Sequence, residues 1–417
     1  MKKTLDVIGI GAINFDFIFS GKKADVNGKK KSDFDDGEEV FVENNIFEDN
    51  LSKVEKHSEL IQSQVGGSAM LAIRTLKNMC PQLQTAYVGV YGNIPEYSKG
   101  KNLPQTENKL RDFFSSFIDD NTWLFNNKQT IVGCALVKLY KRQRQFINIF
   151  TGANNSLLNC IQEKGEVEFI NFLASAKWVH ITSLKDISQF ISIFEYVHQA
   201  KIKNPYLKIS FDPGYDYTKN HWITLKSILP LIDFLFLSKS EASNISKNQG
   251  LSIKAKALDL GEDLKECGAN PQIIIIKKTT SSVLINLIDN KPFVRTYYHK
   301  KLSYTKILND TGAGDAFAGG FIAAILSPYM LSYQPAPIQL ASIAARERLK
   351  SIDWPETSLK ENAKAFFRRN MKNESLNKTQ WLKIKAEILK NPFVNFIIGI
   401  VTGVIASIIY AWLQHKK

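Results

Sequence analysis

Short runs of Val, Ile, Leu and Phe recur along the first 350 residues, and stretches with apolar residues at helical spacing separate them. Buried parallel strands read as nearly continuous apolar runs, so these runs predict strands. The clearest runs cover residues 4–10, 14–19, 85–90, 130–140, 144–150, 178–183, 209–212, 234–237, 273–276 and 283–287. Strands that alternate with helices predict an α/β fold with a doubly wound, mostly parallel sheet covered on both faces.

The composition is that of a globular chain, because 44% of its 417 residues are hydrophobic. The net charge of +14 is unevenly placed, since residues 348–417 carry 13 Lys and Arg against 5 Asp and Glu. This excess precedes an apolar tail, where anionic lipid explains it better than nucleic acid does. We therefore expect no nucleic-acid partner. Four widely spaced cysteines form no CxxC pair, which argues against a zinc ribbon or a disulfide framework.

The end of the chain has the pattern of a membrane anchor. Residues 393–413 carry no charge and would form a helix about 31 Å long, close to the roughly 30 Å hydrocarbon core of a bilayer. They predict a single-pass transmembrane helix over residues 392–414, with membrane lipid as a partner. The basic, helical linker at 351–391 places the preceding domain on the cytoplasmic side. A buried core helix is the alternative interpretation.

Small residues recur within this apolar segment. Gly399, Gly403 and Ser407 lie at four-residue spacing, which would allow two such helices to pack closely. A homodimer is therefore a hypothesis. Glycine is common in membrane spans, so the spacing alone also fits a single helix.

A glycine-rich turn before an apolar helical pattern is the strongest candidate for chemistry. The segment NDTGAGDAF begins at Asn309 and leads into that pattern. Gly312, Ala313 and Gly314 therefore fall at a helix N-terminus, where backbone N–H groups and the helix dipole favour an anion. Asp315 would repel that anion, and its presence makes sense if it takes a proton from an attacking hydroxyl. Alone, the tetrapeptide also fits an ordinary helix start capped by aspartate.

Two polar segments nearer the N-terminus are candidates for substrate binding. Asn14 and Asp16 lie on one face of a predicted strand and can hydrogen-bond neighbouring hydroxyls of a sugar. Gly66 and Gly67 precede a helical pattern at residues 70–79 and allow a ligand to approach the helix N-terminus. A strand-end aspartate and a simple helix-start loop are the alternatives. A dinucleotide motif is disfavoured, because Asn14 replaces its third glycine and a strand pattern follows.

Together these segments resemble the ribokinase-like (PfkB) family of sugar and nucleoside kinases. The family signature is Asp-x-Thr-Gly-Ala-Gly-Asp-Ala-Phe, and only its first position differs here, as Asn309. The resemblance implies that Gly312, Ala313 and Gly314 hold the transferring phosphoryl group. It also implies that Asp315 is the catalytic base.

The resemblance implies a domain layout as well. A kinase domain would span residues 1–350, with a small β-lid from about 17–63 and 130–150. Residues 22–60 read as charged surface around one strand at 39–42. A sugar or nucleoside acceptor would be bound by four residues, namely Asn14, Asp16, Gly66 and Gly67. Leu71 stands where the family's substrate motif has asparagine, so the identity of the acceptor stays open.

ATP and Mg²⁺ are the implied cofactors. The residues expected on the nucleotide are Ser238, Thr279, Ser282, Thr311, Gly312 and Gly314, with Glu241 expected at the metal. Ser238 replaces the asparagine of the family's Asn-x-x-Glu motif, and it also fits a helix N-cap. Thr279 and Ser282 replace the glycines of a Gly-x-x-Gly turn.

Two functions are compatible with these residues. The first is a membrane-tethered, ATP-dependent kinase that transfers the γ-phosphoryl group to a hydroxyl of a sugar or nucleoside. The second is a non-catalytic, membrane-anchored sensor of sugars or nucleosides, which the altered residues on the nucleotide side favour. The intact Gly-Ala-Gly turn and Asp315 favour the kinase.

Overall fold

The structure, a computed structural model, describes residues 4–21, 39–140, 143–182, 184, 186–246, 252–268, 273–277, 281–288, 291–299, 302–303, 306–327 and 336–369. The chain divides into two compact units, residues 1–363 and 364–417, and every element named below belongs to the first. Within the described ranges, no helix is long and apolar enough to cross a bilayer. The predicted span at 392–414 lies outside these ranges, as does most of the predicted linker at 351–391.

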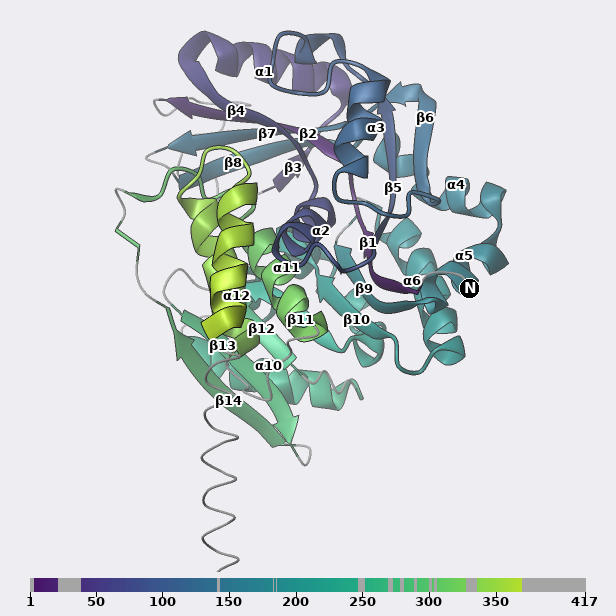
Figure 1. Ribbon diagram of the computed structural model, residues 1–417, viewed down its shortest axis with the longest axis vertical. Helices are drawn as coiled ribbons and strands as arrows, with labels where there is room; N and C mark the ends of the chain where they lie inside the picture. The colour runs from purple at the N-terminus through teal and green to yellow at the C-terminus, as the bar shows by residue number, and fades with distance from the viewer. Residues whose placement is uncertain are drawn as a thin grey trace, which may run out of the picture. The chain divides into compact units, whose positions relative to one another are not determined.

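A nine-stranded sheet forms the centre of the first unit (Figure 1). In spatial order its strands are β14 (Lys291–Tyr298), β13 (Ser281–Ile288), β12 (Ile273–Lys277), β11 (Phe234–Ser238), β10 (Lys208–Asp212), β9 (Ala176–Thr182), β1 (Leu5–Ile10), β5 (Thr85–Asn93) and β6 (Leu124–Ile131). The strands from β12 to β6 are parallel, and β13 and β14 add an antiparallel edge. The predicted mostly parallel sheet is confirmed. The apolar pattern missed β6 and β14, which lie at the two edges and carry interspersed polar residues.

Helices cover both faces of this sheet, as the doubly wound prediction requires. They are α2 (Ser68–Met79), α3 (Glu107–Ser115), α4 (Leu157–Lys164), α5 (Glu166–Ala174), α6 (Ile187–Lys203), α7 (Gly214–Asn220), α8 (Trp222–Leu225), α9 (Lys239–Ile245), α10 (Ile253–Glu266), α11 (Ala313–Leu326) and α12 (Ala336–Leu349), with 3₁₀ turns at Glu96–Ser98, Gly152–Ser156 and Leu229–Leu231. On β11, Phe236 contacts Phe321 of α11 with ring centroids 5.5 Å apart. The next residue, Leu237, belongs to the hydrophobic cluster that contains Phe190 of α6. Because successive strand residues point to opposite faces, α6 and α11 cover opposite sides.

A second, five-stranded sheet forms the lid. Its order is β3 (Glu39–Phe41), β8 (Gln143–Phe150), β7 (Gly133–Tyr140), β2 (Asn14–Gly21) and β4 (Ser58–Gly66). Strand β2 pairs antiparallel with β4 and parallel with β7. These strands come from the segments that the sequence assigned to a lid.

The lid also carries a helix, α1 (Asn44–His57), which corrects part of the interpretation of residues 22–60 as charged surface. Phe47 of α1 lies 6.4 Å from Phe17 and 5.8 Å from Tyr97 between ring centroids. Phe47, Leu51 and Val54 are all buried on one face of the helix. Their spacing of four and three residues is typical of an amphipathic helix. The helix was not predicted from the sequence because many charged residues surround these three apolar positions.

Candidate active site

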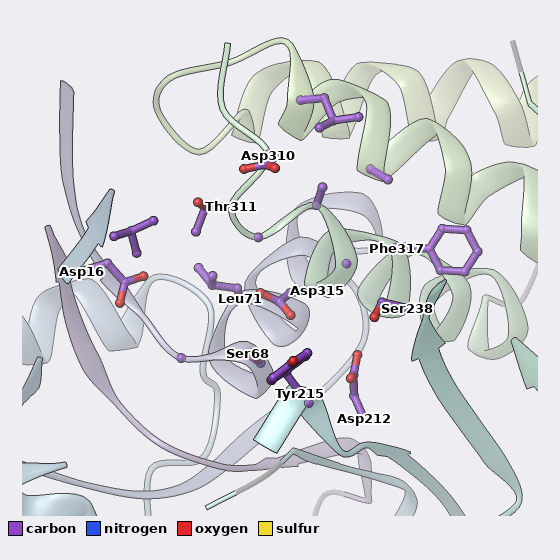
Figure 2. Close-up of a pocket in the computed structure, with 18 of the residues that line it drawn as sticks. Asp16, Ser68, Leu71, Asp212, Tyr215, Ser238, Asp310, Thr311, Asp315 and Phe317 are labelled. Carbon is purple, nitrogen blue, oxygen red and sulfur yellow. The ribbon is translucent and has the colours of Figure 1, made fainter. Parts of the chain in front are cut away.

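One cavity of about 380 Å³ contains most of the residues predicted for the site (Figure 2). The predicted residues on its wall are Asn14, Asp16, Gly67, Ser238, Glu241, Thr311, Gly312, Ala313, Gly314 and Asp315. Three lid residues, Ala135, Val137 and Ile149, line the same cavity. Asp315 is therefore reached by a cavity that extends to the lid.

The glycine turn begins helix α11, as the sequence predicts. Gly312 is the N-cap residue and has the left-handed backbone angles φ 81° and ψ 1°. A Cβ atom at this position would lie 3.0 Å from Cζ3 of Trp354 and 3.4 Å from Cδ1 of Leu71. Both the backbone angle and the close neighbours require glycine. The amides of the first helical turn have no acceptor within the helix, so this end of α11 suits an anion.

Asn14 is held by a second asparagine from the segment that follows the lid. Asn154 Nδ2 donates to Asn14 Oδ1 at 3.0 Å. Asn154 also accepts from the backbone N–H of Ile13 at 2.8 Å and donates to the Ile13 carbonyl at 3.1 Å. The side chain of Asn154 thus fixes the start of β2 and the orientation of the Asn14 amide.

Asp16 is buried in the lid, with an exposed fraction of 6%. Gln64 Nε2 donates to its Oδ2 at 3.3 Å across the β2–β4 pair. The pKa of Asp16 is raised to about 7, chiefly by burial and in part by the charge of Asp315, while Gln64 and Arg348 oppose the rise. Gly66 acts by leaving room, because a Cβ atom there would lie 1.9 Å from Asp16 Oδ2.

The predicted metal residue lies beside the end of β11. Ser238 is the N-cap of α9, and it forms a capping box in which Glu241 N donates to Ser238 Oγ at 3.2 Å and Ser238 N donates to Glu241 Oε2 at 2.6 Å. Ser238, Glu241 and Asp212 all line the cavity. Ser238 therefore combines the N-cap role with a place on the cavity wall.

The oxygen groups at this end of the cavity fit Mg²⁺, which is usually held by one or two carboxylates together with phosphate oxygens. Asp212 and Glu241 supply such carboxylates. In the described part of the chain, no group of three or more His, Cys, Asp or Glu side chains could hold a metal ion. Phosphate and water oxygens would supply the remaining ligands.

A histidine that the sequence did not indicate joins two serines on the nucleotide side. His299 Nε2 lies 2.8 Å from Ser282 Oγ, and His299 Nδ1 lies 2.9 Å from Ser342 Oγ. His299 and Ser342 line the cavity, whereas Ser282 is fully buried. Burial and the charge of Arg346 lower the pKa of His299, which favours the neutral imidazole at physiological pH. Thr279 lies outside the described residues.

The sequence analysis did not single out several other residues at this site. Asp212 and Tyr215 line the cavity near the end of β10, where the polar turn after a predicted strand was a usable signal. Gln62, Gln64 and Arg348 carried no signal, because isolated polar residues in a strand or at a helix end normally indicate solvent-facing positions.

Comparisons with known proteins identify the family to which the chain belongs. Residues 120–340 match the family model described as pfkB family carbohydrate kinase. An adenosine kinase from Schizophyllum commune is 22% identical over 309 residues, covering 70% of this chain and 83% of that protein. An adenosine kinase from Schizosaccharomyces pombe is 22% identical over 285 residues, covering 66% and 76%.

Solved structures show the same fold. Anopheles gambiae adenosine kinase, in complex with P1,P4-di(adenosine-5) tetraphosphate, matches with a TM-score of 0.67 at 19% identity, covering 84% of this chain and 96% of that chain. Giardia lamblia ribokinase matches with a TM-score of 0.65 at 17% identity, covering 86% and 98%. At these identities the likeness establishes the fold, which is ribokinase-like.

Proposed function

The chain belongs to the pfkB family of carbohydrate kinases, which makes it a phosphotransferase with an alcohol acceptor, and we propose that it transfers the γ-phosphoryl group of ATP to a hydroxyl of a nucleoside. The observation that carries the proposal is a single cavity with Asp315 and the glycine turn on its wall, the Asn14 and Asp16 pair toward the lid, and an apolar lid surface.

In this proposal the residues of the glycine turn and Asp315 carry out the transfer. Asp315 takes the proton from the acceptor hydroxyl as that oxygen attacks the γ-phosphorus of ATP. A new P–O bond forms while the bond from the γ-phosphorus to the β,γ-bridging oxygen breaks, and ADP leaves. The amides of the first turn of α11 donate to the phosphoryl oxygens, where negative charge develops. Mg²⁺, when bound, neutralises charge on the phosphates near Glu241. Thr311 and Ser238 line the route for the phosphates, and positioning supplies much of the rate in phosphoryl transfer.

The acceptor end of the cavity combines a polar pair with an apolar wall. Asn14 and Asp16 suit sugar hydroxyls, while Leu71 lies where the family's substrate motif has asparagine, and Val137 and Ile149 add apolar lid surface. Free sugars carry hydroxyls on every side. The hydroxyls that faced this apolar wall would have no hydrogen-bond partner. A nucleoside has a polar ribose and a flat base that can cover apolar side chains. The adenosine kinases among the relatives support the same choice.

The test compares acceptors. Purified protein with radiolabelled ATP and Mg²⁺ is assayed for kcat/KM with a panel of nucleosides and with free ribose and fructose. We expect nucleosides to be preferred, and we expect Leu71→Asn to lower kcat/KM for nucleosides more than for free sugars. Equal or better transfer to free sugars by the wild-type protein would contradict the choice of acceptor.

We further propose that the kinase is tethered to a membrane by residues 392–414, with its first unit on the cytoplasmic side. The uncharged run at 393–413 and the basic residues before it support this proposal. The full-length protein should stay in the membrane pellet after carbonate extraction. The double substitution Ile400→Lys and Ile405→Lys should release it, and extraction of the unsubstituted protein would contradict the proposal.

A further inference from the structure

A chain of buried polar side chains connects the glycine turn with Asp16. Asn309 Nδ2 donates to Gln62 Oε1 at 2.8 Å, and Arg348 Nη2 donates to the same oxygen at 3.2 Å. Gln62 Nε2 donates to Gln64 Oε1 at 2.9 Å, and Gln64 Nε2 donates to Asp16 Oδ2 at 3.3 Å. All five residues have exposed fractions of 7% or less.

The groups at the two ends fix the direction of every bond. The Arg348 guanidinium can only donate, so Gln62 must turn its carbonyl oxygen toward it. The backbone N–H of Thr311 donates to Asn309 Oδ1 at 2.9 Å, which leaves the NH₂ group of Asn309 to face Gln62. Gln62 must then donate to Gln64, and Gln64 must donate to Asp16.

The strand geometry explains why two glutamines bridge this distance. Gln64 pairs with Asp16 and Gln62 pairs with Ile18 in the β2–β4 register. Residues at i and i+2 of a strand share a face, so both amides lie on the face of β4 that carries Gln64 toward Asp16. Gln62 lies on the lid strand β4, whereas Arg348 lies on α12 and Asn309 just before α11. The two hydrogen bonds to Gln62 therefore join the lid to the part of the fold that contains the nine-stranded sheet.

We propose that Gln62 and Gln64 are positioning residues for the acceptor. With Asn309 and Arg348 they form a relay, a chain of hydrogen bonds in which every donor faces toward Asp16. This relay orients the Asp16 carboxylate and connects the lid to the glycine turn. This inference rests on the proposed role of Asp16 in binding the acceptor. In this relay Asn309 is the donor to Gln62. Aspartate, which the family signature has at this position, carries no N–H group and could not donate to Gln62.

The charges around Asp16 make the relay measurable. Arg348 on α12 lowers the pKa of Asp16, Asp315 on α11 raises it, and Cys134 on β7 interacts electrostatically with it. The Gln64 hydrogen bond stabilises the charged form. Loss of that bond should therefore raise the pKa of Asp16 and move the acidic limb of kcat/KM to higher pH.

The experiment uses the full chain and three substitutions. Gln64→Leu removes the bond to Asp16 directly. Asn309→Asp keeps the side-chain size but sets a carboxylate oxygen against the Gln62 oxygen, so the bond from the glycine turn is lost and Arg348 alone holds Gln62 and, through it, Gln64. Each is expected to raise the acceptor KM roughly tenfold or more, with a smaller change in kcat, as loss of a hydrogen bond to a charged group does. Gln129→Leu replaces an exposed glutamine and serves as the matched control.

Carbon-13 NMR of labelled aspartate carboxyls supplies a second readout that needs no turnover, with Asp16→Asn assigning the signal. The Asp16 pKa should rise in Gln64→Leu and in Asn309→Asp, and Asn309→Asp should add little when Gln64 is already leucine. An unchanged pKa in both variants, or a change in Gln64→Leu alone, would overturn the relay. A wild-type protein without turnover would contradict the proposed function, while the NMR titration would still decide the relay.

Discussion

Asp16 on the lid strand β2 and Asp315 on helix α11 line the same cavity (Figure 2), and the two carboxylates interact electrostatically. The pKa of Asp16 is raised to about 7, chiefly by burial, and the negative charge of Asp315 contributes to the rise. A charged Asp16 is the better acceptor for sugar hydroxyls. The two carboxylates therefore couple acceptor binding to pH.

Acceptor binding should weaken as the pH falls through about 7, because Asp16 is protonated there. Asp315→Asn removes the second negative charge, which lowers the pKa of Asp16. Calorimetric titration of adenosine between pH 5.5 and 9 should show the loss of affinity at a lower pH in Asp315→Asn than in the wild-type protein. A loss at the same pH in both proteins would show that the two carboxyls do not interact.

Asp16 should also cost stability at neutral pH. Its pKa in the folded protein, about 7, lies above the ordinary value of 3.8, so the folded state binds the proton more tightly. The free energy of unfolding should therefore fall as the pH rises from about 4 to about 7. Asp16→Asn removes this dependence. Its Tm should match that of the wild-type protein near pH 4 and exceed it at pH 8. At pH 8 we expect its free energy of unfolding to be higher by roughly 1 kcal/mol or more. A lower Tm for the variant at pH 8 would contradict the assignment.

Gly312→Ala should impair catalysis as well as stability. Both Gly312 and Gly100 have left-handed backbone angles, with φ 81° and φ 75°. Alanine at either position should cost about 1–2 kcal/mol of stability. At Gly312 the new Cβ atom would contact Trp354 and Leu71. At Gly100 no neighbouring heavy atom lies within 4 Å of the Cβ position. We expect kcat to fall at least tenfold in Gly312→Ala and to stay unchanged in Gly100→Ala.

Much of the architecture followed from the amino-acid pattern. The apolar runs predicted the parallel strands because those strands are buried on both faces. The turn at Gly312 was recognisable because its residue types report directly on backbone conformation and an unpaired helix end. Such local signals depend on a few consecutive residues.

The remaining site features depend on contacts that no local pattern records. Gln62 and Asn309 are 247 residues apart, and each looks like an ordinary polar residue until the fold joins them. Ser238 and Ser282 departed from the expected motif residues, which suggested a weakened nucleotide site. In the structure each has a hydrogen-bond partner, Glu241 for Ser238 and His299 for Ser282. The Glu241 contact is a local capping box that the N-cap interpretation of Ser238 already allowed, whereas the His299 contact of Ser282 is known only from the fold.

The most direct measurement is transfer of labelled phosphate from ATP to adenosine by the purified full-length protein and by Asp315→Asn. We expect phosphorylated product from the wild-type protein. We also expect kcat to fall at least about a hundredfold in Asp315→Asn, because a positioned general base contributes about that much to the rate. Calorimetry should show that the variant still binds adenosine. Equal kcat values in the two proteins would contradict the assignment of Asp315 as the base.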